Sequence, residues 1–489
     1  MRVQSVMPAV VPAACEDAGL LPGLGVLTSV ITPELVDEVV DLAGCREQRR
    51  RLLPARVMVY FVLGMCLLSG EDSMGPPGYR SVIRSLSHGV RHLAGLALPS
   101  AAALCRRRRM VGVKVLAFLL DRLAGPLAVP GDPGAFAFGL RVVAWDATVT
   151  GVPDAPANAA AFGRHRSGNS DTRQAQPQLR VLALAECGTH GIIDAVFDGF
   201  ATTSELALAP RLLAALGPGM LLLADRNFRG YELWSRAAGT GAELCWRASA
   251  SLILEPLQVL DDGSWTALLL TPAHAQRGRR ELARRGITPQ GTVVRVIQYQ
   301  VTIATSDGTH RRAERFRLVT TILDPERAPA ASLAAIYHQR WEIEGGFLEL
   351  KSRLKGSGFA LRSRDPEMAA QEMLAFLCVQ QALAILENRA ATQAGISPAR
   401  LSFTTTIRIA RDHARTQLTI LTPAGLATAT QAAITDMLAG LLPPRRHRQY
   451  PRQQKLKPAR YTSSNDTTPT YGTITCHIEI KPPPANAGG

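Results

Sequence analysis

A row of four polar side chains stands out for its spacing: Tyr337, Arg340, Glu344 and Lys351. On a helix, at about 100° per residue, these four fall within an arc of roughly 60°. Arginine and lysine bind phosphate oxygens, and a carboxylate binds a divalent metal ion. One helix face with these side chains can therefore bind both phosphates and a metal ion. The same pattern also fits an amphipathic core helix with a solvated charged face, and spacing alone does not separate the two.

Two aspartates lie in or directly after apolar runs that indicate buried strands. Asp146 interrupts the β-branched run 140–148, and Asp225 ends the run that starts at Met220. Open α/β sheets bind ligands at strand ends, although a single aspartate there is more often a turn former or a helix cap. Three carboxylates on separate elements can hold two Mg²⁺ ions about 4 Å apart, which promotes in-line displacement at phosphorus. Together with Glu344, the two aspartates therefore predict phosphodiester cleavage or transfer.

The order of these motifs resembles that of a known family. Tyr-x-x-Arg-x-x-x-Glu-x-x-x-x-x-x-Lys is similar to the signature of the insertion-sequence-four family of bacterial DDE transposases, and the chain matches it at all four positions. Residues 145–148 and 224–228 resemble the two aspartate blocks of the family, and residues 362–368 resemble the segment after its glutamate block. Residues 31–37 and 51–57 resemble its helical amino-terminal region.

The resemblance implies a function and a set of site residues. The function is cut-and-paste DNA transposition: metal-dependent cleavage at the terminal inverted repeats of an element, then strand transfer into target DNA. The implied catalytic and metal-binding residues are Asp146, Asp225 and Glu344, with two Mg²⁺ ions for which Mn²⁺ substitutes. The implied DNA- and phosphate-binding residues are Tyr337, Arg340 and Lys351. A homodimer on double-stranded DNA is expected, in the bacterial cytoplasm and associated with the nucleoid.

The charge of the chain agrees with a nucleic-acid partner. Lysine and arginine number 55 against 40 aspartates and glutamates, which gives a net charge of +15. Such an excess favours binding to an anionic polymer. Basic residues cluster at 49–51, 106–109 and 445–460. The cluster at 106–109 fits either a helix that grips DNA phosphates or a plain surface helix, and the sequence leaves both open.

Cysteine spacing and hydropathy exclude several other classes. The eight cysteines form no Cys-x-x-Cys pair, so a zinc site or a disulfide framework is not expected. The longest apolar stretch, residues 57–68, is shorter than the about 20 residues that cross a bilayer. We therefore expect no membrane partner.

The predicted fold is α/β: a ribonuclease H-like mixed sheet, interrupted by a β-rich insertion, with a helical N-terminal domain. The ribonuclease H-like part follows from the resemblance, because periodicity alone indicates only α/β. The predicted domains are a helical DNA-binding domain (1–135), the first part of the catalytic domain (136–248), the β-rich insertion (249–330), the glutamate helix with C-terminal helices (331–442) and a basic, proline-rich disordered tail (443–489).

Individual elements follow from periodicity and capping residues. Helix starts are expected at Thr32-Pro33 and at Ser100. Strands are expected at 140–148, 178–185, 192–197, 220–225, 243–247, 293–303 and 316–323. Further helices are expected at 204–216, 231–238 and 366–391.

Two alternatives share these features: a related DNA endonuclease or resolvase, and a non-catalytic DNA-binding protein derived from a transposase. The order of the carboxylates and the long insertion argue against the first. All three carboxylates are present, so the sequence shows no sign of the second. A metal-dependent strand-transfer assay separates the three functions.

Overall fold

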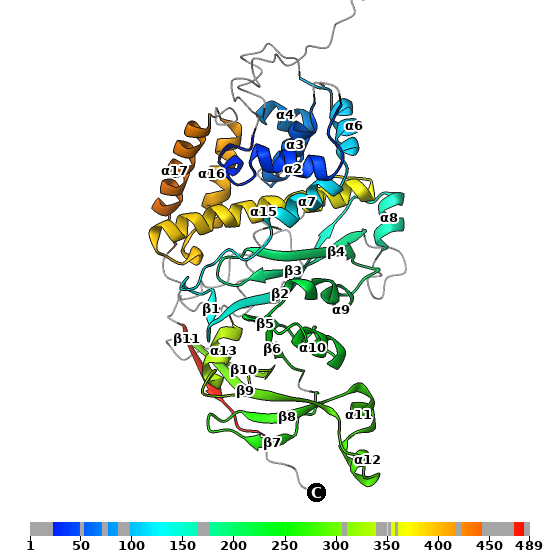
Figure 1. Ribbon diagram of the computed structural model, residues 1–489, viewed down its shortest axis with the longest axis vertical. Coiled ribbons are helices and arrows are strands. Elements are labelled where there is room, and N and C mark those ends of the chain that lie inside the picture. Colours follow the sequence, from blue (N-terminus) through cyan, green and yellow to red (C-terminus); the bar gives the residue numbers. More distant parts are fainter. Residues whose placement is uncertain are drawn as a thin grey trace, which may run out of the picture. The chain divides into compact units, whose positions relative to one another are not determined.

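The chain divides into two compact units. The computed structural model (Figure 1) describes residues 23–48, 53–70, 77–86, 98–164, 176–249, 251–305, 311–338, 350, 354–356, 360–416, 422–442 and 474–483. Unit 1 comprises Met1–Leu221 and Arg340–Leu442, and unit 2 comprises Leu222–Gln339 and Pro443–Gly489. The class is mixed α/β, with a large mixed sheet and many helices, which agrees with the predicted class.

The amino-terminal part of unit 1 is helical. It contains η1 (Gly25–Ser29), α2 (Pro33–Leu42), α3 (Ala55–Leu67), α4 (Tyr79–Leu86), α6 (Ala101–Val111) and α7 (Lys114–Leu123). The Thr32 side chain accepts a hydrogen bond from Leu35 N at the start of α2, and Ser100 accepts one from Ala103 N at the start of α6. Both predicted helix starts are therefore confirmed. Helix α3 is buried except at Arg56 and Val57, because Arg56 is its one charged residue.

One long helix, α15 (Pro366–Ala394), forms the core of unit 1 (Figure 1). Asp365 caps it by accepting a hydrogen bond from Met368 N, and Gly395 ends it with a φ of +63° that suits glycine. It packs against α3, α7, α8 (Pro156–Phe162), α16 (Phe403–Arg415) and α17 (Pro423–Ala439). Within the described residues it is the one helix long and apolar enough to cross a membrane, but 89% of its apolar window is buried, as in a core helix.

Three long strands of unit 1 form an antiparallel group. They are β2 (Leu140–Gly151), β3 (Gln178–Glu186) and β4 (Ile192–Gly199), in the order β4-β3-β2, with the short β1 (Phe136–Ala137) on β2. All three predicted strands are confirmed. The helix expected at 204–216 is instead α9 (Glu205–Leu208) followed by the 3₁₀ helix η2 (Ala209–Ala215). Pro210 lacks the N–H that a continuing α-helix requires, which explains the change.

Unit 2 is built around a β-rich segment. The strand β5 (Met220–Ala224) leads into it, followed by α10 (Tyr231–Ala238) and β6 (Glu243–Arg247), as predicted. The antiparallel order is β6-β10-β9-β8-β7, with β7 (Pro256–Val259), β8 (Trp265–Leu270), β9 (Gly291–Thr305) and β10 (Arg311–Thr320). The short helices α11 (Pro272–Arg277) and α12 (Arg279–Arg284) follow β8, and α13 (Ala330–Tyr337) packs on β9.

The end of the chain departs from the prediction of a disordered tail. Residues Ile474–Ile480 form β11, which pairs antiparallel with residues 299–305 of β9. β-Branched residues recur in this segment, which suits a strand, and the part of β9 beyond β8 offers a backbone edge to pair with. The prediction is therefore wrong for these residues, while 443–473 lie outside the described residues.

Candidate functional site

Asp146 lies within β2 and opposes Ala183 of β3. Side chains of a strand alternate between its two faces, so Asp146 points away from the face of its neighbour Trp145, which is 0% exposed. Asp146 itself is partly exposed. The strand therefore offers a carboxylate at its surface while a large buried side chain anchors the other face.

Asp225 follows directly after β5 and is fixed by a tight turn. Its Oδ1 accepts a hydrogen bond from Asn227 N at 2.8 Å, and its carbonyl accepts one from Phe228 N at 3.2 Å. The Phe228 side chain is buried and anchors the turn, and Gly230 with a φ of +112° leads into α10. Within the described residues Oδ2 has no hydrogen-bond partner, so the turn holds a carboxylate with one oxygen available.

Tyr337 is the last residue of α13 and is buried. It is 2% exposed, and its hydroxyl donates to the carbonyl of Ala224 at 3.4 Å. Ala224 directly precedes Asp225, so the tyrosine lies against the strand end that carries this aspartate. The sequence placed Tyr337 in the first turn of the glutamate helix, facing DNA. The structure ends α13 at Tyr337, so this residue lies in the last turn of a helix, and its contact with DNA stays a prediction.

The remaining members of the predicted row are Arg340, Glu344 and Lys351, which lie outside the described residues. Their roles stay predictions. Leu350 and Leu354, which lie on either side of Lys351 in the sequence, are described and buried. Among the residues that the structure describes, no group of three or more His, Cys, Asp or Glu side chains could hold a metal ion. A three-carboxylate site would therefore need a carboxylate from outside the described residues, which is the predicted role of Glu344.

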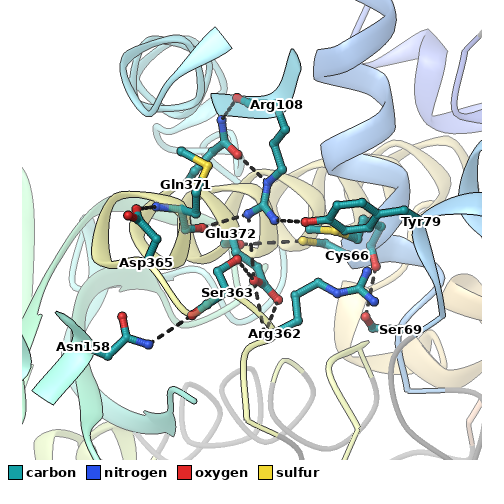
Figure 2. A network of polar contacts seen from close by, with 12 residues as sticks. Cys66, Ser69, Tyr79, Arg108, Asn158, Arg362, Ser363, Asp365, Gln371 and Glu372 are labelled. Atoms are coloured by element: carbon teal, nitrogen blue, oxygen red, sulfur yellow. Dashed lines mark hydrogen bonds and ion pairs between the residues drawn. The ribbon is translucent and has the colours of Figure 1, made fainter. Parts of the chain in front are cut away.

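The segment after the glutamate block is held by a buried polar network (Figure 2). Glu372 of α15 accepts hydrogen bonds from Arg362 N at 3.0 Å and from Ser363 Oγ at 2.6 Å. The carbonyl of Ser363 accepts one from Asn158 Nδ2 at 3.1 Å, and Leu361 N donates to the carbonyl of Gly151 at the end of β2. Residues 361–363 are thereby fixed between α15 and β2, within unit 1.

Arg108 of α6 completes this network from the helical part of unit 1. It is 1% exposed and donates to Gln371 Oε1 at 2.6 Å, to the Tyr79 hydroxyl at 2.7 Å and to the Met368 carbonyl at 2.8 Å. Its Nη2 lies 3.9 Å from Glu372 Oε2. The sequence reasoning missed this network. The signal that could have revealed it is the pair Gln371-Glu372 inside an otherwise apolar helix, because buried polar groups require partners.

The basic cluster at 106–109 has two faces. Arg107 is also buried and donates to the Leu53 carbonyl at 2.8 Å and to Glu47 Oε2 at 3.1 Å. Arg106 and Arg109 are exposed, and they lie about 60° apart on the helix. The inward pair therefore fixes α6 and the outward pair faces solvent.

Helix α4 packs against α6 and adds two more exposed arginines, Arg80 and Arg84. Neither helix contains an aspartate or a glutamate. Within the described part of the chain, none of these four exposed arginines has an ion-pair or hydrogen-bond partner, whereas Arg122 of α7, which is also exposed, pairs with Glu38 at 2.8 Å. We call Arg80, Arg84, Arg106 and Arg109 the α4/α6 arginine group.

Comparison with known proteins gives a consistent result. Residues 22–121 match the family described as insertion element 4 transposase N-terminal, and residues 137–380 match the transposase DDE domain. The transposase InsG for insertion sequence element IS4, from Escherichia coli (strain K12), is 25% identical over 451 residues, which cover 90% of this chain and 93% of that protein. Among solved structures, the piggyBac transposase synaptic complex with hairpin DNA aligns with a TM-score of 0.42 and 10% identity over 87% of each chain.

These matches cover the helical part of unit 1 and the segment that carries Asp146, Asp225 and Glu344. The class of protein is therefore a DDE-type transposase, an enzyme that acts on DNA. Within that class, the chain belongs to the insertion-sequence-four family.

Proposed function

We propose that Asp146, Asp225 and Glu344 together bind two Mg²⁺ ions and cleave DNA at the terminal inverted repeats of the element, before joining the ends to target DNA. The observation that carries this proposal is the turn at Asp225, which fixes one carboxylate oxygen and leaves the other without a hydrogen-bond partner among the described residues. The donor set fits, because carboxylate oxygens are the ligands that Mg²⁺ prefers, and Mn²⁺ accepts the same set. When bound, the ions would stabilise the attacking and leaving oxygens at phosphorus.

The protein residues supply positioning. The Asn227 N–H orients the Asp225 carboxylate, and the buried Trp145 anchors the strand that presents Asp146. Arg340 and Lys351 are proposed to hold phosphates on either side of the scissile bond, since both share the predicted helix face of Glu344.

The same proposal includes a ribonuclease H-like core, a homodimer and association with the nucleoid. A ribonuclease H-like core is supported by three successive antiparallel strands, β2 to β4, and by Asp146 within the first of them. A homodimer suits an element with two ends, because one copy can hold each end. Association with the nucleoid in a bacterial cytoplasm follows from DNA as the partner.

The helical part of unit 1 is proposed to bind DNA through the α4/α6 arginine group. The four guanidinium groups have no carboxylate partner in the described residues, so their charge is available to phosphates. Phosphate contacts of this kind fix the register of a protein on the duplex without reading bases. The inward pair, Arg107 and Arg108, holds the helix that carries half of this group.

The experiment uses the full chain and a DNA fragment carrying one end of its element. With Mg²⁺ or Mn²⁺ the wild type should nick the end and join it to a target plasmid. D146N, D225N and E344Q should each abolish nicking yet retain end binding in Ca²⁺, because each loses a metal ligand and keeps its volume. Full nicking by any of the three variants would remove that residue from the proposed site.

A further inference from the structure

Two exposed arginines belong to the turn that begins at Asp225. Arg226 and Arg229 lie one and four residues after the aspartate. Within the described residues neither guanidinium group has an ion pair or a hydrogen bond, although the Asp225 carboxylate is so close in the sequence. Phe228 lies between them and is buried, so it holds the turn in place. The turn therefore carries positive charge that no described carboxylate neutralises.

A second basic feature of unit 2 is the α11/α12 hairpin, which we define as residues 271–290 between β8 and β9. It contains five arginines and one glutamate. Arg277 is exposed and has no ion-pair or hydrogen-bond partner in the part of the chain that the structure describes. The side chains of Arg284 and Arg285 are 78% and 62% exposed, and both pair with the single carboxylate of Glu281. The hairpin therefore keeps a net positive charge on its exposed surface.

Hydrogen bonds hold the α11/α12 hairpin in one conformation. Thr271 N donates to the carbonyl of Gln290 at 3.0 Å, and Gln290 N donates to His274 Nδ1 at 2.8 Å, which closes the base of the hairpin. Leu282 is 0% exposed and anchors α12, and Gly278 forms the turn between the two helices with a φ of +76°. Arginines on a fixed scaffold lose less conformational freedom on binding phosphates than arginines on a mobile loop.

One hydrogen bond joins the base of the hairpin to the helix that follows the Asp225 turn. The hydroxyl of Tyr231, the first residue of α10, bonds to Thr292 Oγ1 at 3.2 Å. Tyr231 lies two residues after Arg229, and Thr292 lies two residues after Gln290. Figure 1 shows α10, α11 and α12 at the same end of the strands β8 and β9, away from β11. The turn and the hairpin therefore border one surface of unit 2.

We propose that the turn and the α11/α12 hairpin form a second DNA-binding surface, which binds phosphates of the duplex next to the cleaved bond. Its residues are Arg229, Arg277, Arg284 and Arg285, which we call the unit 2 arginine group. The inference rests on the proposed function only in taking Asp225 as part of the catalytic site. Guanidinium groups bind phosphates without reading bases, so this contact is independent of DNA sequence. A merely solvated charged surface would add nothing to the salt dependence of DNA binding.

The test measures the affinity of the full chain for three DNA duplexes in Ca²⁺ over a range of salt concentrations. The first duplex ends at the cleavage site of the element, and the second continues past this site into flanking DNA. The third is a target duplex of unrelated sequence, offered to the complex of protein and element end. The variants are R229A and the triple variant R277A/R284A/R285A. Arg226 is left unchanged because it directly adjoins a proposed metal ligand.

The control variant is R315A. Arg315 of β10 is also exposed, and it has no ion-pair or hydrogen-bond partner among the described residues. It opposes Gln300 of β9, which lies nine residues after Gly291 at the base of the hairpin. At about 3.3 Å per residue, this separation is about 30 Å along the strand. The control therefore removes a similar arginine from the same unit, away from the proposed surface.

The triple variant should lower the slope of log affinity against log salt by about 2, because Glu281 competes with phosphate for one of the three guanidinium groups. R229A should lower the slope by about 1. A loss on all three duplexes assigns the surface to the element end. A loss that needs the flanking DNA assigns it to the flank, and a loss on the third duplex alone assigns it to the target.

R315A should keep the wild-type slope on every duplex, and all variants should keep the wild-type melting temperature because the replaced side chains are exposed. A wild-type slope of the triple variant on all three duplexes would overturn the inference, as would an equal loss in R315A. Nicking by D225N in Mg²⁺ would instead refute the proposed function. Because the slopes are measured in Ca²⁺ without cleavage, the two failures are distinct.

Discussion

Replacing Glu372 with glutamine perturbs the network that joins the segment after the glutamate block to α15. The Glu372 side chain is 5% exposed and accepts hydrogen bonds from Arg362 N and Ser363 Oγ, with Arg108 Nη2 3.9 Å away. Glutamine keeps the volume but loses the charge and replaces one acceptor oxygen with a donor NH₂ group. The amide oxygen can still accept from Arg362 N, and the NH₂ group can meet Ser363 Oγ only if that hydroxyl turns to accept, so both bonds lose their charged partner.

The magnitude follows from these contacts. A hydrogen bond to a charged group contributes about 1.5–3 kcal/mol, and breaking a buried ion pair costs about 3–5 kcal/mol. Arg108 keeps its bonds to Gln371, Tyr79 and Met368 in the variant, so it is not left without partners. We therefore expect E372Q to lower the free energy of unfolding of unit 1 by about 2–3 kcal/mol, which is less than the full ion-pair cost.

The assay is calorimetric unfolding of the full chain, with E38Q as the control. Glu38 also pairs with an arginine, Arg122 at 2.8 Å, but its side chain is 48% exposed. E38Q should change stability by less than about 1 kcal/mol, as exposed pairs do. E372Q should lower the melting temperature of unit 1 by several degrees. Equal effects of the two variants on the melting temperature would refute the explanation that Glu372 stabilises unit 1 because it is buried.

Three further predictions concern other parts of the chain. Burial lowers the pKa of His413, and its Nδ1 has no hydrogen-bond partner in the described part of the chain, so the folded state favours the neutral ring. That contribution to stability is present above the ordinary histidine pKa and is lost as pH falls through the lowered pKa of His413. The fall in melting temperature between about pH 7 and 5 should therefore be smaller in H413Q than in the wild type. An equal fall in both proteins would exclude His413 as the source of this pH dependence. Deleting residues 474–489 removes β11 and uncovers residues 299–305 of β9, so the melting temperature of unit 2 should fall by several degrees. Deleting only residues 484–489 should leave it unchanged. Equal melting temperatures of the two truncated proteins would show that β11 does not stabilise unit 2. The double variant R106A/R109A should lower the slope of log affinity for DNA against log salt by about 2, with R122A unchanged, and a wild-type slope would place α6 outside the interface.

Local patterns were sufficient to predict most elements. The strand at 243–247 and the helix at 231–238 have the predicted bounds, because apolar alternation and the glycines at 230 and 239 mark them in the sequence itself. The position of Asp225 directly after β5 was likewise predictable, because the apolar run of this strand stops there.

What local patterns could not supply depends on partners far along the chain. Arg106 and Arg108 are the same residue type two positions apart, yet one is exposed and the other is buried against α15. The helical spacing fits either orientation, and only the position of Gln371 and Met368 decides it. The tail strand β11 was missed for the same reason, since its partner β9 lies far earlier in the sequence. The end of α13 at Tyr337 was not predicted, because nothing local in the sequence marks it.

The most direct test of the proposed catalytic site asks whether Asp146, Asp225 and Glu344 bind the same metal ions. Fe²⁺ bound in place of Mg²⁺ generates hydroxyl radicals in the presence of ascorbate and peroxide, and these cleave the polypeptide beside the metal. In the DNA-bound protein, we expect cleavage near residues 146, 225 and 344, suppressed by excess Mg²⁺ and by D225N. Cleavage that omits the region of Glu344, or that excess Mg²⁺ leaves unchanged, would contradict a shared three-carboxylate site.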